Sequence, residues 1–139
     1  MVSFLLDTVL LSELRKTKPS RKVIRWVQGQ KPETLFISVV SIGEIERGIE
    51  MARKTDAAFA TELELWLEAL LRLYDDQVLP VSAHAARLWG RLSAKLGHDG
   101  VDLLIAATAL TNGLTVATRN VKHFAPTGVA VINPFDDIK

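Results

Sequence analysis

The chain has 139 residues, of which 48% are hydrophobic and 24% are charged. That balance is typical of a globular protein and excludes a disordered chain, and the length suits a single domain, residues 1–139, with one sizeable core. The formal net charge of +1 provides no general attraction to nucleic acid, so a nucleic-acid partner would require a local basic patch. The absence of cysteine excludes disulfides and thiolate zinc sites.

No segment is long and apolar enough to span a bilayer. An apolar run lies near the N-terminus, but Asp7 interrupts it and no basic segment precedes it, which excludes a secretion signal of the usual pattern. We therefore expect a soluble, cytoplasmic protein without a membrane partner.

The first predicted elements are a short strand and a helix that follows it directly. Phe4–Leu6 is a short apolar run that ends at Asp7, and Leu10, Leu11 and Leu14 then recur at helical spacing. This pattern is typical of the first half of a βα unit, and it leaves the Asp7 carboxylate at the carboxyl end of a strand. Ligands of open parallel sheets bind at that edge.

Strands and helices alternate along the rest of the chain. Several predicted helices begin at a serine or aspartate that can cap them, and glycine follows two of them. This alternation predicts an α/β fold, a three-layer α/β/α sandwich around a central, mostly parallel sheet of about five strands. After the first helix, we predict helices at 20–29, 41–51, 56–73, 82–97 and 101–110, a short turn or helix at 120–124, and strands at 35–40, 77–81, 114–118 and 129–132.

The segment Ser41-Ile-Gly-Glu44 has the spacing of a capping box. In a capping box, the serine and glutamate side chains accept hydrogen bonds from amides at the start of a helix. The pattern predicts that Ser41 caps the helix after the second strand. This structural role would account for Glu44 without any chemistry.

Polar residues follow the strands at four places: Asp7, Glu44, Asp102 at the start of a buried helix, and Asn120. Each carboxylate has a local explanation, since Asp7 can cap a helix and Asp102 can complement a helix dipole. However, right-handed crossovers bring the starts of successive helices to one edge of the sheet. Three carboxylates converging there would repel one another, and a hard divalent cation such as Mg²⁺ would remove that conflict. The placement is compatible with metal-dependent hydrolysis of a phosphodiester.

The chain resembles PIN domains, most closely the VapC type, including its FitB-like branch, which are toxins of bacterial type II toxin–antitoxin pairs. Each matching motif is short, but together they occur in the family's order and extend over essentially the whole chain. The matching motifs are Phe4–Leu14, Ser38–Gly48, Asp102–Ala109, Thr115–Phe124 and Val131–Phe135.

This resemblance implies a Mg²⁺- or Mn²⁺-dependent endoribonuclease. It makes Asp7 and Asp102 the principal metal ligands, and Glu44 a third acid that binds the metal directly or through water. Asn120 takes the place of a fourth acid, and Thr8 and Thr118 would shape the site. The resemblance also implies a homodimer, an RNA substrate, and a small VapB-like antitoxin that binds DNA and blocks the active site.

Two residues depart from the family pattern. Val9 stands where the family usually has an asparagine that hydrogen-bonds within the acidic cluster, so Asp7 would be less firmly oriented. His123 stands where aspartate is frequent. Because the three carboxylates are retained, we expect weakened rather than abolished activity.

Other charged residues near these motifs have less specific interpretations. Arg119 is a candidate for contacting RNA phosphate, and a solvated arginine after a strand is an equally good reading. His84, His98 and His123 share no metal-ligand spacing, so the sequence predicts no zinc site.

Two alternatives to a nuclease are compatible with parts of the pattern. The first is a catalytically silent PIN-fold protein that only pairs with its antitoxin, and Val9 motivates it. The second is a receiver or nucleotide-binding domain, which also alternates strands and helices. The chain lacks both the acidic pair of a receiver and a glycine-rich phosphate loop.

Overall fold

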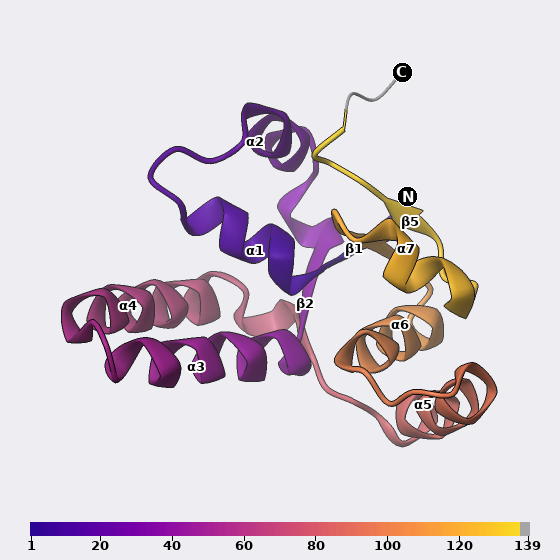
Figure 1. Ribbon diagram of the computed structural model, residues 1–139. Helices are drawn as coiled ribbons and strands as arrows, with labels where there is room; N and C mark the ends of the chain where they lie inside the picture. The colour runs from indigo at the N-terminus through magenta and orange to yellow at the C-terminus, as the bar shows by residue number, and fades with distance from the viewer. Residues whose placement is uncertain (137–139) are drawn as a thin grey trace.

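The computed structural model describes residues 1–136 and has a five-stranded parallel sheet at its centre (Figure 1). The strand order is β3-β2-β1-β4-β5, so β1 lies in the middle with β2 and β4 beside it. The chain therefore changes direction across the sheet between β1 and β4, the kind of position where open α/β sheets bind ligands. The strands are β1 (Phe4–Leu6), β2 (Leu35–Ser38), β3 (Val78–Leu79), β4 (Thr115–Ala117) and β5 (Val131–Ile132).

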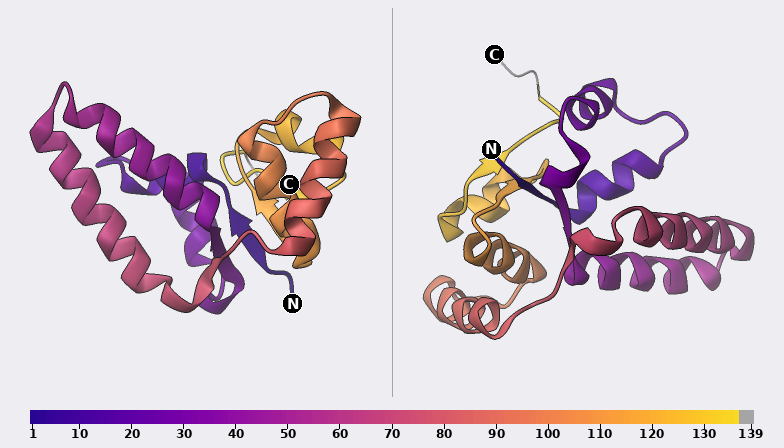
Figure 2. Two further views of the ribbon diagram at one scale, coloured as in Figure 1. Left: turned by 90° about the horizontal axis from the view of Figure 1, so that it is seen from below. Right: turned by 180° about the vertical axis from the view of Figure 1, so that it is seen from behind.

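Helices cover both faces of the sheet. Figure 1 shows α1 to α4 on one side and α5 to α7 on the other, and Figure 2 shows α3 and α4 as a long pair that extends away from the sheet. The helices are α1 (Thr8–Arg15), α2 (Arg21–Gln28), α3 (Val39–Arg53), α4 (Ala57–Leu73), α5 (Ala83–Leu96), α6 (Val101–Thr111) and α7 (Val121–Phe124), with 3₁₀ turns at Pro32–Thr34, Asp75–Gln77 and Ala125–Thr127.

Alternation of side chains along the central strand divides the core between the two faces. Phe4 and Leu6 pack with α1 to α4, where the Phe4 ring meets Trp26 edge-on at 4.8 Å, whereas Leu5 packs with α6 and Phe124 of α7. Because successive side chains of a strand point to opposite faces, three apolar residues in a row suit a strand buried on both sides. The predicted three-layer α/β/α fold is confirmed.

Most predicted helix starts are also confirmed. Ser20, Asp56 and Ser82 accept hydrogen bonds from amides in the first turns of α2, α4 and α5. Gly97 ends α5 with a φ of 77°, a left-handed conformation that glycine adopts without a steric penalty. Of the described residues, none forms a helix that is long and apolar enough to cross a membrane.

The predicted start of the third helix is wrong. The expected strand 35–40 ends at Ser38, and α3 begins at Val39 with Ser38 as its cap, because the Ser38 hydroxyl accepts from the amide of Val40 at 3.0 Å. Ser41 is buried inside the first turn and caps nothing, so Ser41 and Glu44 do not form a capping box. The capping-box explanation for Glu44 is thereby removed.

Candidate functional site

Asp7 lies at the centre of the carboxyl edge of the sheet, where β1 passes into α1. Its amide donates to Ala117 O at 3.0 Å, which extends the pairing of β1 with β4 by one residue. Its carboxylate caps α1 by accepting from the amide of Thr8 at 2.9 Å, and Oδ2 accepts from the Thr118 hydroxyl at 2.7 Å. Only 4% of Asp7 is exposed, so this carboxylate is held in one place and largely shielded from water.

The surroundings of Asp7 work against its charged form. The pKa of Asp7 is raised from 3.8 to about 6, chiefly by burial, although hydrogen bonds from Thr118 and Thr8 oppose that change. The negative charges of Asp102 and Glu44 are smaller contributions to the same rise in the pKa of Asp7. The fold thus brings Asp102 and Glu44, the other two carboxylates predicted from the sequence, within electrostatic reach of Asp7.

Glu44 reaches this edge from α3. Its Oε1 accepts from the Thr8 hydroxyl at 2.6 Å, and Thr8 Oγ1 also lies 2.8 Å from the hydroxyl oxygen of Ser41. Thr8 therefore joins the start of α1 to the early turns of α3 beside Asp7. The hydroxyl that was expected to cap α3 belongs instead to this contact between helices.

Asp102 lies in the first turn of α6, where a carboxylate is favourable near the helix N-terminus. Its Oδ2 is 3.2 Å from Nδ1 of His123, on α7. Both side chains line a cavity of about 370 Å³ with His98, Lys122 and others. No spacing in the sequence predicts the pairing of Asp102 with His123.

Thr118 connects the two halves of the site. This fully buried residue follows β4, and its hydroxyl donates to Asp7 while accepting from the amide of Asn120 at 2.9 Å. Asn120 begins α7 without a capping bond from its side chain, and that side chain is exposed at the same edge.

Arg119 is exposed and has contacts within the protein. Its guanidinium carbon lies 4.0 Å from the centre of the Phe135 ring, a cation–π arrangement. Contact of Arg119 with RNA stays a prediction.

Glu13 is a buried carboxylate that was not among the predicted site residues. Hydrogen bonds from the Lys16 ammonium and the Ser20 amide lower the pKa of Glu13, and the charge of Arg119 lowers it slightly more.

A groove runs away from the site between α1, α3 and α4. It has a volume of about 210 Å³ and begins at Thr8 and Glu44. Arg15 lies over the Phe59 ring at 5.2 Å along this groove, and Gly48 provides a stretch without a side chain. The groove wall also includes the apolar side chains of Ile45, Phe59, Leu63 and Trp66.

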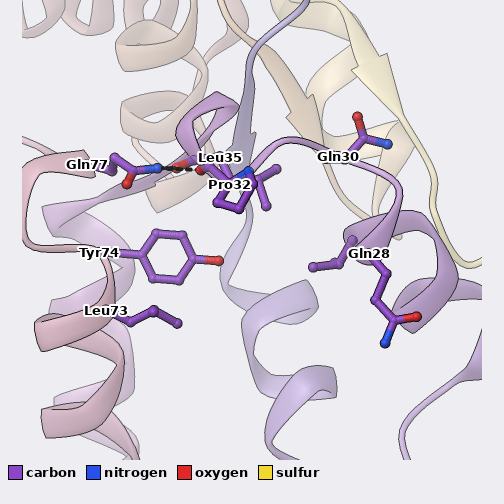
Figure 3. A pocket seen from close by; sticks show the side chains of 8 residues that line it. Gln28, Gln30, Pro32, Leu35, Leu73, Tyr74 and Gln77 are labelled. Carbon is purple, nitrogen blue, oxygen red and sulfur yellow. Dashed lines mark hydrogen bonds between the residues drawn. The ribbon is translucent and has the colours of Figure 1, made fainter.

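A larger pocket lies at the opposite edge, where β2 begins, and Figure 3 shows it from close by. It has a volume of about 360 Å³, and Tyr74 extends into it with its hydroxyl leading. The Gln77 amide donates to the carbonyls of Pro32 and Leu35, each at 2.6 Å, and so fastens the turn before β2. Among residues 1–136, no carboxylate lines this pocket, so the described part of it has no counterpart to the acids around Asp7.

The carboxylates at this edge have the chemistry to bind a metal ion but are not arranged as a complete metal site. Within residues 1–136, no group of three or more His, Asp or Glu side chains is close enough together to hold one ion. Mg²⁺, however, usually binds proteins through one or two carboxylates and completes its shell with water and phosphate oxygens. Asp7 and Asp102 supply such hard oxygen donors, and a cation would offset both the burial of the Asp7 carboxylate, which is the main cause of its raised pKa, and the nearby charges of Asp102 and Glu44. The donor set therefore fits Mg²⁺ or Mn²⁺.

Comparisons with known proteins agree on one family. The PIN domain family model matches residues 4–127. The VapC ribonuclease Y4jK of Sinorhizobium fredii is 35% identical, over 94% of this chain and 96% of its own. The plasmid stability protein StbB of Pseudomonas syringae is 34% identical, over 95% of this chain and 98% of its own.

Solved structures extend the comparison to complexes. The chain resembles one in the crystal structure of FitAcB from Neisseria gonorrhoeae, with a TM-score of 0.84 and 29% identity over 95% of this chain and 98% of that one. It also resembles a chain of FitAB bound to a DNA fragment, with a TM-score of 0.85 and 27% identity over 98% of both chains.

Proposed function

Because the chain belongs to the PIN domain family, we propose that it is a VapC-like endoribonuclease and the toxin of a type II toxin–antitoxin pair. The observation that carries this proposal is the Asp7 carboxylate at the edge where β1 ends, whose pKa is raised mainly by burial and additionally by the charges of Asp102 and Glu44. Relatives named as ribonucleases, such as VapC5 of Mycobacterium tuberculosis at 32% identity over 73% of this chain, support the same activity.

We propose that Asp7 and Asp102 hold Mg²⁺ or Mn²⁺, with Glu44 binding it directly or through water. When bound, such an ion lowers the pKa of a coordinated water and stabilises the charge that develops on the phosphodiester. The protein orients the donors, since Thr118 and the Thr8 amide fix the two oxygens of Asp7, and the Thr8 hydroxyl holds Glu44. The exposed side chain of Asn120 is positioned to contact the substrate or a bound water.

The test is cleavage of single-stranded RNA by protein purified free of its partner, with Mg²⁺ or Mn²⁺ supplied. Asp7→Ala should lower the rate by at least about a hundredfold, because it removes a direct metal ligand. Asp75→Ala is the matched control, since Asp75 is an exposed aspartate in the turn after α4. Cleavage that survives EDTA, or that Asp7→Ala leaves unchanged, contradicts the proposal.

We further propose that the partner is a small, DNA-binding, VapB-like antitoxin with a segment that covers this site. The FitAB and VapBC complexes to which the chain is similar support this partner. The groove that starts at Thr8 and Glu44 offers an apolar path for such a segment, and its end at the carboxylates would explain inhibition.

The groove can be filled without disturbing the core. A Cβ added at Gly48 would meet no atom within 4 Å apart from its chain neighbours and the backbone of its own helix, and the same holds for Gly90 on α5. Gly48→Leu should weaken binding of the cognate antitoxin by about tenfold or more, while Gly90→Leu should not. Equal affinities would place the antitoxin elsewhere.

Light scattering on the same samples tests the expected homodimer.

A second candidate function is antitoxin pairing without catalysis. The observation that favours it is Val9, which lies half-buried beside Asp7 and brings no polar group to the acids. Val9→Asn should raise the cleavage rate if orientation of Asp7 limits activity, because an amide can hydrogen-bond to the carboxylates. Absence of cleavage in both forms, with intact antitoxin binding, would favour the silent protein.

A further inference from the structure

The cavity beside Asp102 brings together histidines that are far apart in the sequence. His98 lies in the loop before α6 and His123 on α7, and both line this cavity with Asp102. Their nitrogens differ in availability, because Nδ1 of His98 accepts from the Gly100 amide at 3.2 Å. Nδ1 of His123 instead lies 3.2 Å from Oδ2 of Asp102.

That separation suits two donors of one ion. Neighbouring ligands of an octahedral cation, each about 2.1 Å from the metal, are roughly 3 Å apart. The 3.2 Å between His123 Nδ1 and Asp102 Oδ2 is close to that spacing. The imidazole is 60% exposed, so water and ions can reach it.

Hydrogen bonds fix the backbone of His123 relative to Asp7. The His123 amide donates to Asn120 O at 3.0 Å, and the Asn120 amide donates to the Thr118 hydroxyl, which donates to Asp7. The next residue, Phe124, is fully buried and anchors α7 in the core. The backbone that bears the His123 imidazole is therefore connected by hydrogen bonds to Asp7, the predicted metal ligand on the other side of the site.

We propose that His123 is a nitrogen ligand of the cation at Asp102, and that it shifts the preference of the site from Mg²⁺ toward first-row transition cations. This inference rests on the metal site of the proposed function and adds a ligand to it. Mg²⁺ selects oxygen donors, whereas imidazole suits cations later in the first row. A site of carboxylates alone would show little of this preference.

Lys122 is compatible with this assignment. Lys122 is one of the residues that line the same cavity, where its ammonium would repel a bare cation but attract the phosphate oxygens that complete the shell of a bound one. An anion site without metal is the competing reading of the same basic side chains. Metal binding measured in the absence of RNA and phosphate separates the two.

The first measurement is ¹H NMR of the metal-free protein during addition of substoichiometric Mn²⁺. The chain has only three histidines, so their imidazole signals can be assigned by single substitutions. The His123 signals should broaden first and those of His84, on the surface of α5, last. Equal broadening of all three, or broadening of His98 before His123, overturns the proposal.

The second measurement is calorimetric titration with Co²⁺ and, separately, Mg²⁺. His123→Ala should weaken Co²⁺ binding by about tenfold or more and change Mg²⁺ binding by less than about threefold. His98→Ala is the matched control and should change neither. His123→Asp supplies an oxygen donor and should reverse the preference toward Mg²⁺.

Unchanged Co²⁺ affinity in His123→Ala overturns the inference, whether or not the wild-type protein cleaves RNA. Loss of Co²⁺ affinity supports it, even in a protein that cleaves no RNA under any condition, and that second result would count against the nuclease alone. Thermal unfolding of the metal-free variants checks that they fold, as the exposure of His123 leads us to expect.

Discussion

At the carboxyl edge of the sheet a buried carboxylate meets two other acids, whereas at the amino edge a glutamine amide binds two backbone carbonyls. Asp7 is held by good hydrogen bonds, yet burial and like charges disfavour its ionised form. Gln77 adds a donor to two carbonyls of the turn before β2, and one of them, Pro32 O, also accepts from the amide of Leu35. Of these two groups, only Asp7 has surroundings that work against its charge, as expected where side chains are arranged for chemistry rather than for folding.

The largest effect should come from neutralising Asp7. Its pKa is raised on folding from 3.8 to about 6, so the folded state binds more protons than the unfolded state between these values. Stability from this group is present below pH 3.8 and is lost as pH rises through about 6, by up to about 3 kcal/mol. Asp7→Asn should therefore raise the free energy of unfolding at pH 7.5 more than at pH 4.5, measured by urea denaturation without metal.

The same comparison provides the control. Mg²⁺ should stabilise the wild-type protein at pH 7.5 and have little effect on Asp7→Asn, because binding to the folded state alone raises its stability. If Asp7→Asn stabilises the protein no more at pH 7.5 than at pH 4.5, the surroundings of Asp7 do not disfavour its charged form.

A smaller effect, in this case a loss of stability, should follow from removing the hydrogen bonds of Thr118, which link the two halves of the site. Thr118→Val keeps the shape of this buried side chain but removes its bonds to Asp7 and to the Asn120 amide. It should cost about 1–3 kcal/mol and also lower RNA cleavage. Thr108→Val is the control, since the buried Thr108 hydroxyl donates only to a carbonyl of its own helix, Leu104 O. Similar effects on cleavage would exclude a special role for Thr118.

The smallest effect is expected at the amino edge. Gln77→Met removes the bonds to Pro32 O and Leu35 O and should cost about 1 kcal/mol in chemical denaturation, with unchanged RNA cleavage. Gln28→Met, an exposed change at the rim of the same pocket, should cost less. A loss of cleavage in Gln77→Met would show that the two edges are coupled.

Local patterns were sufficient to predict the layers of the fold. The apolar run Phe4–Leu6 gave the central strand, and caps such as Ser20 and Ser82 gave helix starts, because these signals lie within a few residues of the element they define. The predicted start of α3 was wrong because Val39 and Val40 have the β-branched side chains that are typical of a strand, and because Ser41 has the spacing of a helix cap. The Ser41 hydroxyl is instead used in a contact with Thr8, which local spacing cannot reveal.

The candidate site was predicted only in part for the same reason. Asp7, Glu44 and Asp102 follow strands or begin helices, so topology alone suggests one edge. The proximity of His123 to Asp102 depends on how α7 packs beside α6, and burial of Glu13 depends on Lys16 and the Ser20 amide closing over it. The Glu13–Lys16 pair has the i,i+3 spacing of a helix and was visible in the sequence, whereas the contact of His123 with Asp102 is set by packing between elements and leaves no such pattern.

Because α3 begins at Val39, directly after its cap Ser38, the direction in which Glu44 points from the helix axis is fixed. One extra residue between these positions would turn the carboxylate by about 100° around the helix axis and away from Thr8. Four extra residues would bring the Glu44 side chain back to within about 40° of its present direction around the helix axis, but would move it about 6 Å along that axis. The number of residues from Ser38 to Glu44 therefore cannot change without moving Glu44 away from Thr8 and Asp7.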